Sequence, residues 1–272
     1  MNDTDYVLGH AEAELRRLST QARLIDPITR RFLEAAGIAK GMRILDVGSG
    51  AGDVAFLCGE LVGPTGEVVG TDLARAAVER AELRAKNAGA ARISFKHGDP
   101  AELNFDGPFD AIVGRYVLQF IPDPAQSLRQ IVRHLRPGGV VVFHELDWDG
   151  ARSSPPSPTY DQVCGWLSRT IEGAGAQVRL GARLASLFEE AGLPSPILRL
   201  EAVISSGLRA VDVVHLVTDL VETQLPTMER LGIVAASQVN PLTLADRILS
   251  EVGAGGTLMG RSEIGAWTTK PV

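Results

Sequence analysis

Residues 44–53 read Ile44-Leu45-Asp46-Val47-Gly48-Ser49-Gly50-Ala51-Gly52-Asp53, a short apolar run that leads into a glycine-rich loop. The run 44–47 is too short and too apolar for a surface helix, so we predict a buried β-strand. Glycine lacks a Cβ, which lets the loop turn tightly and lets a ligand approach its backbone. With a helix expected over 53–62, this stretch is typical of the first strand, loop and helix of a parallel sheet.

Short apolar runs continue to alternate with helical stretches on the C-terminal side of this loop. The pattern predicts further strands at residues 67–71, 93–95, 111–113 and 140–143, and a helix over about 74–88. Asp123-Pro124 supplies the N-cap and first-turn proline of another helix. We therefore expect an α/β fold with a doubly wound parallel sheet.

The two ends of the chain have a more helical pattern. Residues 6–36 predict two helices, with Pro27 as the break between them. The Pro/Ser-rich stretch 153–158 predicts a loop. The remaining expected elements are a helix around 184–192, a strand over 197–205, a helical insert over 209–252 and a last strand near 258–269. We predict a single domain over 1–272: a helical lid (1–40), a cofactor-binding core (41–150), and acceptor-pocket elements with the last two strands (151–272).

Composition excludes several classes of protein. The 272 residues are 45% hydrophobic and 22% charged, which is ordinary for a folded globular chain. The net charge of -6 argues against a nucleic-acid-binding protein, because such proteins usually concentrate positive charge. No apolar run approaches the roughly 20 residues of a membrane span, so no membrane partner is expected. Two cysteines and an acidic N-terminus favour a reducing, cytoplasmic setting.

The spacing of polar residues favours a nucleoside without phosphates. A dinucleotide-binding loop would need glycine at position 53, where this chain has Asp53, and a carboxylate there would repel a pyrophosphate. Asp53 also suits the helix dipole. Asp72 follows the second strand, where a carboxylate can accept both hydroxyls of a ribose; its alternative is a helix N-cap. Asp99 in Gly98-Asp99-Pro100 can meet an adenine amino group or form a turn.

Four stretches together resemble a known family, the class I S-adenosylmethionine-dependent methyltransferases of the small-molecule, ubiquinone-methyltransferase-like branch. They are Ile44–Asp53, Val69–Leu73, His97–Ala101 and Phe109–Phe143, the last beginning FDAIVGRYVLQFIPDP and ending LRPGGVVVF. The resemblance covers roughly residues 40–150. It implies a Rossmann-like, doubly wound, seven-stranded sheet with the last strand antiparallel, N-terminal lid helices and a helical insert before the last strand.

The same resemblance implies S-adenosyl-L-methionine as cofactor, bound across the ends of the first four strands. By it, Asp46 and the loop residues Gly48, Ser49, Gly50 and Gly52 hold the methionine part. Asp72 with Leu73 holds the ribose, and Gly98, Asp99 and Pro100 hold the adenine. Arg115 faces the methionine end and the reaction centre, unless it is a surface arginine that packs its stem. Tyr6, in the lid, is expected to close over the cofactor.

A methyl group on a sulfonium is already a strong electrophile, so the protein mainly has to align the acceptor and exclude water. A base is useful for a hydroxyl acceptor and optional for an amine. The candidates are His144, Glu145 and Tyr116, with hydrogen bonding to a loop as the alternative for His144. Trp148 offers an aromatic wall or simply packs.

The sequence thus predicts transfer of a methyl group to an O or N atom of a small molecule, with no metal because no histidine has ligand-like spacing. Two alternatives stay open: a nucleotide-dependent oxidoreductase, which Asp53 disfavours, and a non-catalytic S-adenosylmethionine-binding protein. The valine-rich face at residues 213–221 suits a protein core or the surface of a homodimer.

Overall fold

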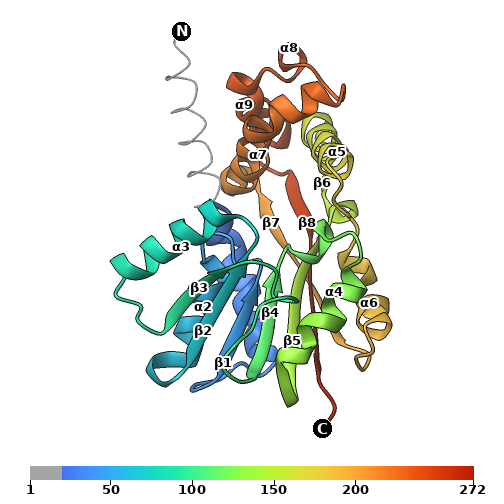
Figure 1. Cartoon of the computed structure of the whole chain (residues 1–272). Coiled ribbons are helices and arrows are strands. Elements are labelled where there is room, and N and C mark those ends of the chain that lie inside the picture. Colours follow the sequence, from blue (N-terminus) through green and yellow to red (C-terminus); the bar gives the residue numbers. More distant parts are fainter. Residues whose placement is uncertain (1–19) are drawn as a thin grey trace. The chain divides into compact units, whose positions relative to one another are not determined.

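The structure is a computed structural model in which residues 20–272 are described (Figure 1). Contacts between Cα atoms divide the chain into two compact units. The larger contains residues 26–146, 180–200 and 263–272, and the other contains 147–179, 201–262 and the described residues up to 25. The prediction of one domain over the whole chain stays a prediction.

The larger unit contains the predicted parallel sheet. Its strands are β1 (Arg43–Val47), β2 (Glu67–Asp72), β3 (Ile93–His97), β4 (Phe109–Arg115) and β5 (Leu135–Asp147), joined by the C-terminal half of β8 (Thr257–Thr269). The order is β3-β2-β1-β4-β5-β8, and the first five strands pair in parallel. The order reverses between β1 and β4, which is where a doubly wound sheet binds its ligands.

The helices of the larger unit follow its strands along the chain. They are α2 (Asp53–Val62), α3 (Arg75–Asn87), α4 (Pro124–Ile131) and α6 (Leu184–Glu190). The predicted N-cap of α4 is confirmed, since the Asp123 side chain accepts from the Gln126 backbone N–H at 2.9 Å. Short 3-10 helices lie at Gly63–Thr65, Leu118–Phe120, Val132–His134 and Gly181–Arg183.

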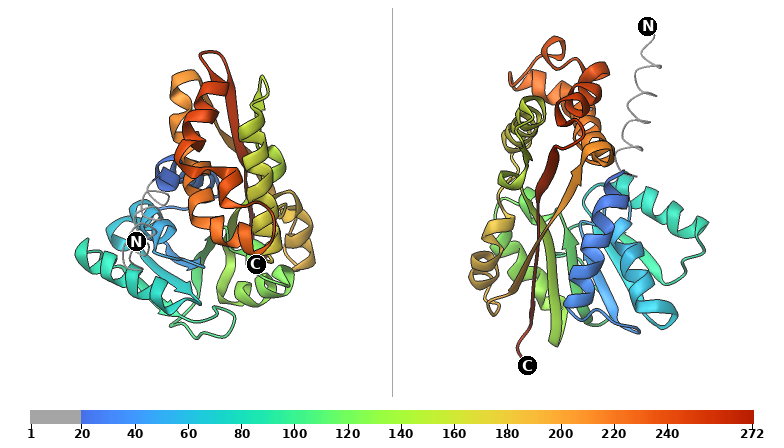
Figure 2. Two further views of the ribbon diagram at one scale, coloured as in Figure 1. Left: turned by 90° about the horizontal axis from the view of Figure 1, so that it is seen from above. Right: turned by 180° about the vertical axis from the view of Figure 1, so that it is seen from behind.

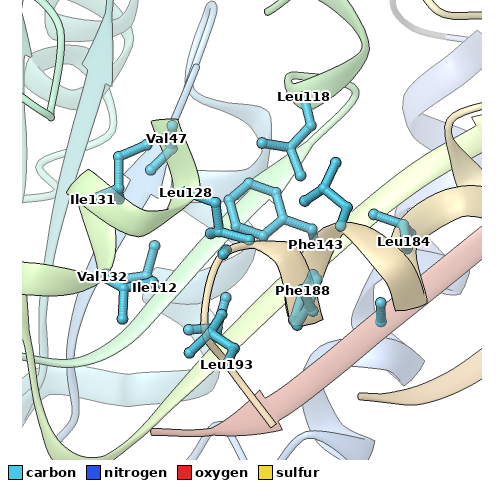
Figure 3. Close-up of a cluster of buried hydrophobic side chains, with 14 of the residues drawn as sticks. Val47, Ile112, Leu118, Leu128, Ile131, Val132, Phe143, Leu184, Phe188 and Leu193 are labelled. Atoms are coloured by element: carbon cyan, nitrogen blue, oxygen red, sulfur yellow. The ribbon is translucent and has the colours of Figure 1, made fainter. Parts of the chain in front are cut away.

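One face of this sheet packs against α4 and α6, which lie next to each other beside β5 (Figure 1). Phe143 of β5 and Phe188 of α6 meet edge to face, with ring centroids 6.4 Å apart, in the cluster drawn in Figure 3. Leu128 and Ile131 of α4 are buried in the same cluster. This core fixes the backbone on which the strand ends present their polar residues.

The second unit is mainly helical (Figure 2). Its long helices α5 (Pro158–Gly173), α7 (Val211–Arg230) and α9 (Pro241–Val252) contact one another, and α8 (Ala236–Val239) is a single turn. The short strand β6 (Arg152–Ser154) pairs antiparallel with the start of β8. Strand β7 (Ile197–Ser206) also pairs with β8. Further 3-10 helices lie at Trp148–Gly150 and Gly207–Ala210.

The fold class is confirmed: the sheet is doubly wound, its last strand runs antiparallel to β6, and a helical insert precedes that strand. With β6, the sheet has eight strands among the described residues, one more than the seven expected. The valine-rich face of α7 is buried, so at Val213, Val214, Val217 and Val221 it belongs to a protein core.

Three expectations about local structure were wrong. The helix over residues 20–35 continues through Pro27, because its buried residues Ile28 and Phe32 pack on the same side beyond the proline. The stretch 153–158 is only partly a loop, since it contains the end of β6 and the start of α5, where the Ser157 side chain caps the helix and Pro158 takes its first position. The fifth strand runs over 135–147 instead of 140–143.

No helix among residues 20–272 combines the length and the apolar character that crossing a membrane would require. Within the same residues no group of histidine, cysteine and acidic side chains is arranged to hold a metal ion.

Candidate functional site

The glycine-rich loop lies between the end of β1 and the start of α2. Gly48, Gly50 and Gly52 have φ angles of 64°, 53° and 93°, a left-handed region that side chains disfavour. A Cβ on Gly48 would lie 2.4 Å from a methyl carbon of Val117, whereas a Cβ on Gly50 would meet nothing within 4 Å. The loop therefore packs against the chain at Gly48 and leaves open space above Gly50.

Asp72, at the end of β2, is tied to this loop. One carboxylate oxygen accepts the Gly50 backbone N–H at 2.9 Å, and the other accepts the Ala74 N–H at 2.8 Å. The N-cap of α3 is Ala74, so the cap role weighed for Asp72 is not seen in the structure. A carboxylate oxygen can accept more than one hydrogen bond, which leaves Asp72 able to bind a ligand hydroxyl on each oxygen.

A pocket of about 480 Å³ opens at this edge of the sheet, a size within the usual range for small-molecule sites. Six predicted cofactor residues line it: Gly48, Asp72, Leu73, Gly98, Asp99 and Pro100. The catalytic candidate Tyr116 lines it as well. Residues from strands far apart in sequence therefore meet at one cavity, as their positions at strand ends predict.

Sequence reasoning missed part of the pocket wall. Val117, Phe120, Ile121 and Pro122 follow the end of β4 and line the pocket, and Phe120 is 63% exposed. The signal was present in the sequence, because an apolar run directly after a strand of this sheet must pass the ligand-binding edge. The pocket lining consequently combines these apolar residues with the two carboxylates of Asp72 and Asp99.

The charges of the pocket favour a ligand without phosphate groups. The described residues that line it include Asp72 and Asp99 and contain neither lysine nor arginine. Asp53 is paired with Arg84 at 2.7 Å, so its charge at the start of α2 is largely compensated. The pocket lining is thus a stronger argument against a pyrophosphate than Asp53 by itself.

The turn after β3 positions Asp99. Its side chain accepts the Ala101 backbone N–H at 2.8 Å, which is the turn-forming role considered for it. The neighbouring Pro100 carbonyl lies 2.9 Å from the His134 ring nitrogen Nε2. The turn is therefore held from two sides while Asp99 still faces the pocket, and both interpretations of Asp99 are compatible with the structure.

Asp46, on β1, is 1% exposed, and neither of its carboxylate oxygens has a hydrogen-bond partner among the described residues. Burial raises the pKa of this carboxyl to about 8, and the nearby charge of Arg115 opposes the rise. An unsatisfied buried carboxyl is costly and marks a place where a polar ligand group would be stabilised. The Ser49 hydroxyl, in the glycine-rich loop, is likewise buried without a partner in the described part of the chain.

Arg115 is buried, with only 5% of its side chain exposed, so it is no surface arginine. Its guanidinium donates to the Asp26 carboxylate at 2.6 Å and to the Thr29 hydroxyl at 3.0 Å. Both partners lie on the helix over residues 20–35. This helix is therefore anchored at the carboxyl end of β4, and the lid role expected for it stays a prediction. Tyr6 lies outside the described residues.

His144 and Tyr116 belong to one hydrogen-bond network. Tyr116 follows β4 with a φ of 58°, an unusual value for a residue with a side chain. Its hydroxyl donates to Glu263 at 2.6 Å, and the His144 Nε2 lies 2.9 Å from the same carboxylate oxygen. The His144 Nδ1 lies 3.1 Å from the Thr29 hydroxyl. The prediction gave no role to Glu263, which comes from β8.

Glu145 contacts a different part of the structure from its neighbour His144. One oxygen accepts the backbone N–H groups of Val117 and Leu118 at 2.9 and 2.8 Å, and the other is buried without a partner in the described residues. Burial raises the pKa of this carboxyl to about 8, although the backbone N–H groups oppose the rise. Glu145 thus anchors the segment after β4.

We expect Glu145→Gln to remove a pH dependence of stability. A carboxyl whose pKa is raised from 4.5 in the unfolded chain to about 8 contributes stability below pH 4.5, and this is lost as the pH rises through 8. Glutamine resembles the protonated carboxyl and does not ionise. The free energy of unfolding of the variant, relative to wild type, should therefore rise by more than about 1 kcal/mol between pH 5 and pH 9. Urea unfolding at both pH values measures this, and a difference that does not change with pH would contradict it.

Trp148, in the second unit, is 5% exposed, and the Arg261 guanidinium lies 5.5 Å from its ring centroid. The structure therefore shows a packed tryptophan. The cysteines Cys58 and Cys164 are free and buried, as expected.

Comparison with known proteins agrees with this geometry. A family model described as a methyltransferase domain matches residues 38–192. A relative, demethylmenaquinone methyltransferase of Staphylococcus aureus, is 35% identical over 135 residues, which are 49% of this chain and 53% of that protein. The chain thus spans about half the length of the curated relatives it matches.

Solved structures share the fold at lower identity. Phosphoethanolamine N-methyltransferase 2 of Haemonchus contortus, in complex with phosphomonomethylethanolamine and S-adenosylhomocysteine, superposes with a TM-score of 0.55 at 19% identity, over 89% of this chain and 52% of that one. The cyclase SpnF superposes equally well, with a TM-score of 0.55 at 22% identity over 91% and 81% of the two chains. The match of the family model across more than half of the sequence confirms the resemblance seen in its motifs, and the chain belongs to the methyltransferase domain family.

Proposed function

We propose that the protein transfers a methyl group from S-adenosyl-L-methionine to an O or N atom of a small molecule. The observation that carries this proposal is the pocket of about 480 Å³, where the Asp72 carboxylate, tied to Gly50, faces a cavity without lysine or arginine among its described lining residues. Family membership gives the chemistry and this pocket gives the ligand class.

The residues present fit the cofactor. Asp72 is suited to the ribose hydroxyls, and the turn at Gly98, Asp99 and Pro100 borders the same cavity where an adenine would lie. The open space above Gly50 and the unsatisfied carboxyl of Asp46 suit the methionine part, whose ammonium group would give Asp46 the partner it lacks. When bound, the cofactor supplies an electrophilic methyl group on a sulfonium.

The protein's own contribution is positioning and exclusion of water. Val117, Phe120, Ile121 and Pro122, which follow β4, form the apolar part of the pocket lining. Tyr116 lines the pocket and is hydrogen-bonded to Glu263, which His144 also contacts, so these three residues are the proposed route for a proton from a hydroxyl acceptor. Glu145 has a different task, since it binds the backbone of that wall.

For the acceptor we propose an apolar small molecule of natural-product or quinone-like size. The support is the relative named for demethylmenaquinone, together with the apolar pocket wall that includes the exposed Phe120. We also propose that the enzyme acts in the cytoplasm, because its free, buried cysteines agree with a reducing compartment.

Calorimetry with S-adenosylmethionine, S-adenosylhomocysteine and NAD tests the cofactor. We expect the first two to bind and NAD to leave no signal, because no lysine or arginine among the described lining residues would pair with its pyrophosphate. Binding of NAD in preference to S-adenosylhomocysteine would overturn the proposal in favour of an oxidoreductase. Mass spectrometry of a panel of quinols, phenols and amines incubated with the protein and S-adenosylmethionine then separates an enzyme from a non-catalytic binder, since only the enzyme yields a methylated product.

A further inference from the structure

Glu263 forms hydrogen bonds with two residues at the ends of neighbouring strands, Tyr116 after β4 and His144 on β5. It lies on β8, 119 positions from His144 and 147 from Tyr116, and both bond the same carboxylate oxygen. Glu263 and His144 are 1% and 2% exposed. Removing the carboxylate therefore deletes one hydrogen bond from Tyr116 and one from His144, and the bond to His144 is deep in the protein.

The hydrogen bonds of this network have one consistent direction. An ionised carboxylate only accepts, so the His144 Nε2 carries the proton toward Glu263. In the neutral ring the His144 Nδ1 is then an acceptor, and it accepts a hydrogen bond from the Thr29 hydroxyl. The Thr29 oxygen in turn accepts from Arg115. Glu263 thereby fixes one neutral tautomer of His144.

Glu263 also holds a strained residue at the pocket. Tyr116 has a φ of 58°, a backbone conformation that is unfavourable in free energy for any residue except glycine. Such a conformation persists only where the surrounding structure holds it. The backbone bond from Tyr116 to the His144 carbonyl, 2.9 Å long, holds one end, and the hydroxyl bond to Glu263 holds the other. Tyr116 begins the turn that places Val117 against Gly48 and along the pocket.

We propose that Glu263 is a positioning residue of the cofactor pocket: through its bonds to Tyr116 and His144 it sets the turn after β4, and hence the wall that S-adenosylmethionine contacts. This inference rests on the proposed function for the identity of the ligand. By this proposal, a residue of β8 affects cofactor binding although Glu263 itself is not among the residues that line the pocket.

Calorimetric titration of S-adenosylhomocysteine into four variants tests the proposal. Glu263→Ala should weaken binding about tenfold, and Tyr116→Phe, which deletes only the hydroxyl, should weaken it in the same direction. Because both changes break the same bond, the double variant should be little worse than Glu263→Ala. Glu263→Gln retains an acceptor oxygen and should recover most of the lost affinity.

Asp110→Ala is the matched control. Asp110 lies at the opposite end of β4, where it accepts from the Arg43 backbone N–H at 2.7 Å and pairs with Arg136. Its removal deletes a bonded carboxylate from the same sheet without touching the turn. We expect it to lower stability and leave the affinity for S-adenosylhomocysteine unchanged.

Nitrogen-15 NMR of the histidine rings gives a readout that needs no ligand. In the wild type His144 should show the neutral tautomer protonated at Nε2, and Glu263→Ala should change that signature while Asp110→Ala preserves it. Wild-type affinity in Glu263→Ala, additive losses in the double variant, or an Nδ1-protonated His144 would each overturn the inference. A wild-type protein that binds no S-adenosylhomocysteine would instead overturn the proposed function, and the NMR result would still report on the network.

Discussion

Replacing Asp72 with alanine is expected to weaken the binding of S-adenosylhomocysteine by about tenfold to 150-fold. The carboxylate is proposed to accept the ribose hydroxyls, and a hydrogen bond to a charged group contributes about 1.5 to 3 kcal/mol. Asp72 also accepts a hydrogen bond from the Gly50 backbone N–H, so its loss loosens the glycine-rich loop as well as removing the acceptor for the ribose. Isothermal titration calorimetry measures the change directly.

Asp53→Ala is the control for this experiment. It removes a carboxylate of equal charge from the start of α2, directly after the loop that Asp72 contacts, but Asp53 is paired with Arg84 and is not part of the pocket lining. Its effect on affinity should stay within about threefold, which is less than 1 kcal/mol. Equal losses in the two variants would mean that general electrostatics, and not ribose binding, explains the effect of Asp72.

Gly50→Val should abolish measurable cofactor binding, with a loss of more than about 100-fold. A Cβ at this position would meet no protein atom within 4 Å, so the fold has room for the side chain. That room is the space in which the ligand is proposed to lie, and the valine methyl groups would fill it. Binding should therefore fail while the protein still folds.

Gly89→Val separates this steric effect from backbone strain. Gly89, after α3, has a φ of 63° against 53° at Gly50, and a Cβ there would also meet nothing within 4 Å. Both variants should lose a similar 1 to 3 kcal/mol or so of stability, because both force a side chain into the left-handed region. Only Gly50→Val should lose affinity, and a Gly50→Val protein that binds normally would show that the loop does not touch the ligand.

Helix ends and the residues that follow each strand could be predicted from the sequence, because they depend on short local patterns. The helix expected over 53–62 has these bounds in the structure, because Gly52 and Gly63 stop it at both ends. The pocket residues that follow β1, β2 and β3 could be placed together because the carboxyl ends of parallel strands meet at one edge. The helix α5 was missed, since the Pro/Ser-rich stretch before it suggested a loop and not a helix cap.

The network around His144 depends on contacts that no local pattern encodes. Thr29 and Glu263 lie 115 and 119 positions away from it, on a helix and a strand that sequence reasoning located but could not orient. The opposite tasks of His144 and Glu145 arise because successive side chains of a strand face opposite sides of the sheet. Because they are neighbours in the sequence, both were candidates for the catalytic base. In the structure, Glu145 instead accepts hydrogen bonds from the backbone N–H groups after β4.

A crystal structure of the protein with S-adenosylhomocysteine tests the central claim most directly. The account predicts the adenosine in the pocket beside β2 and β3, with both ribose hydroxyls about 2.7 Å from the Asp72 carboxylate oxygens and the amino acid part above Gly50. Adenosylhomocysteine bound away from Asp72, or a pyrophosphate lying on the glycine-rich loop in its place, would contradict it.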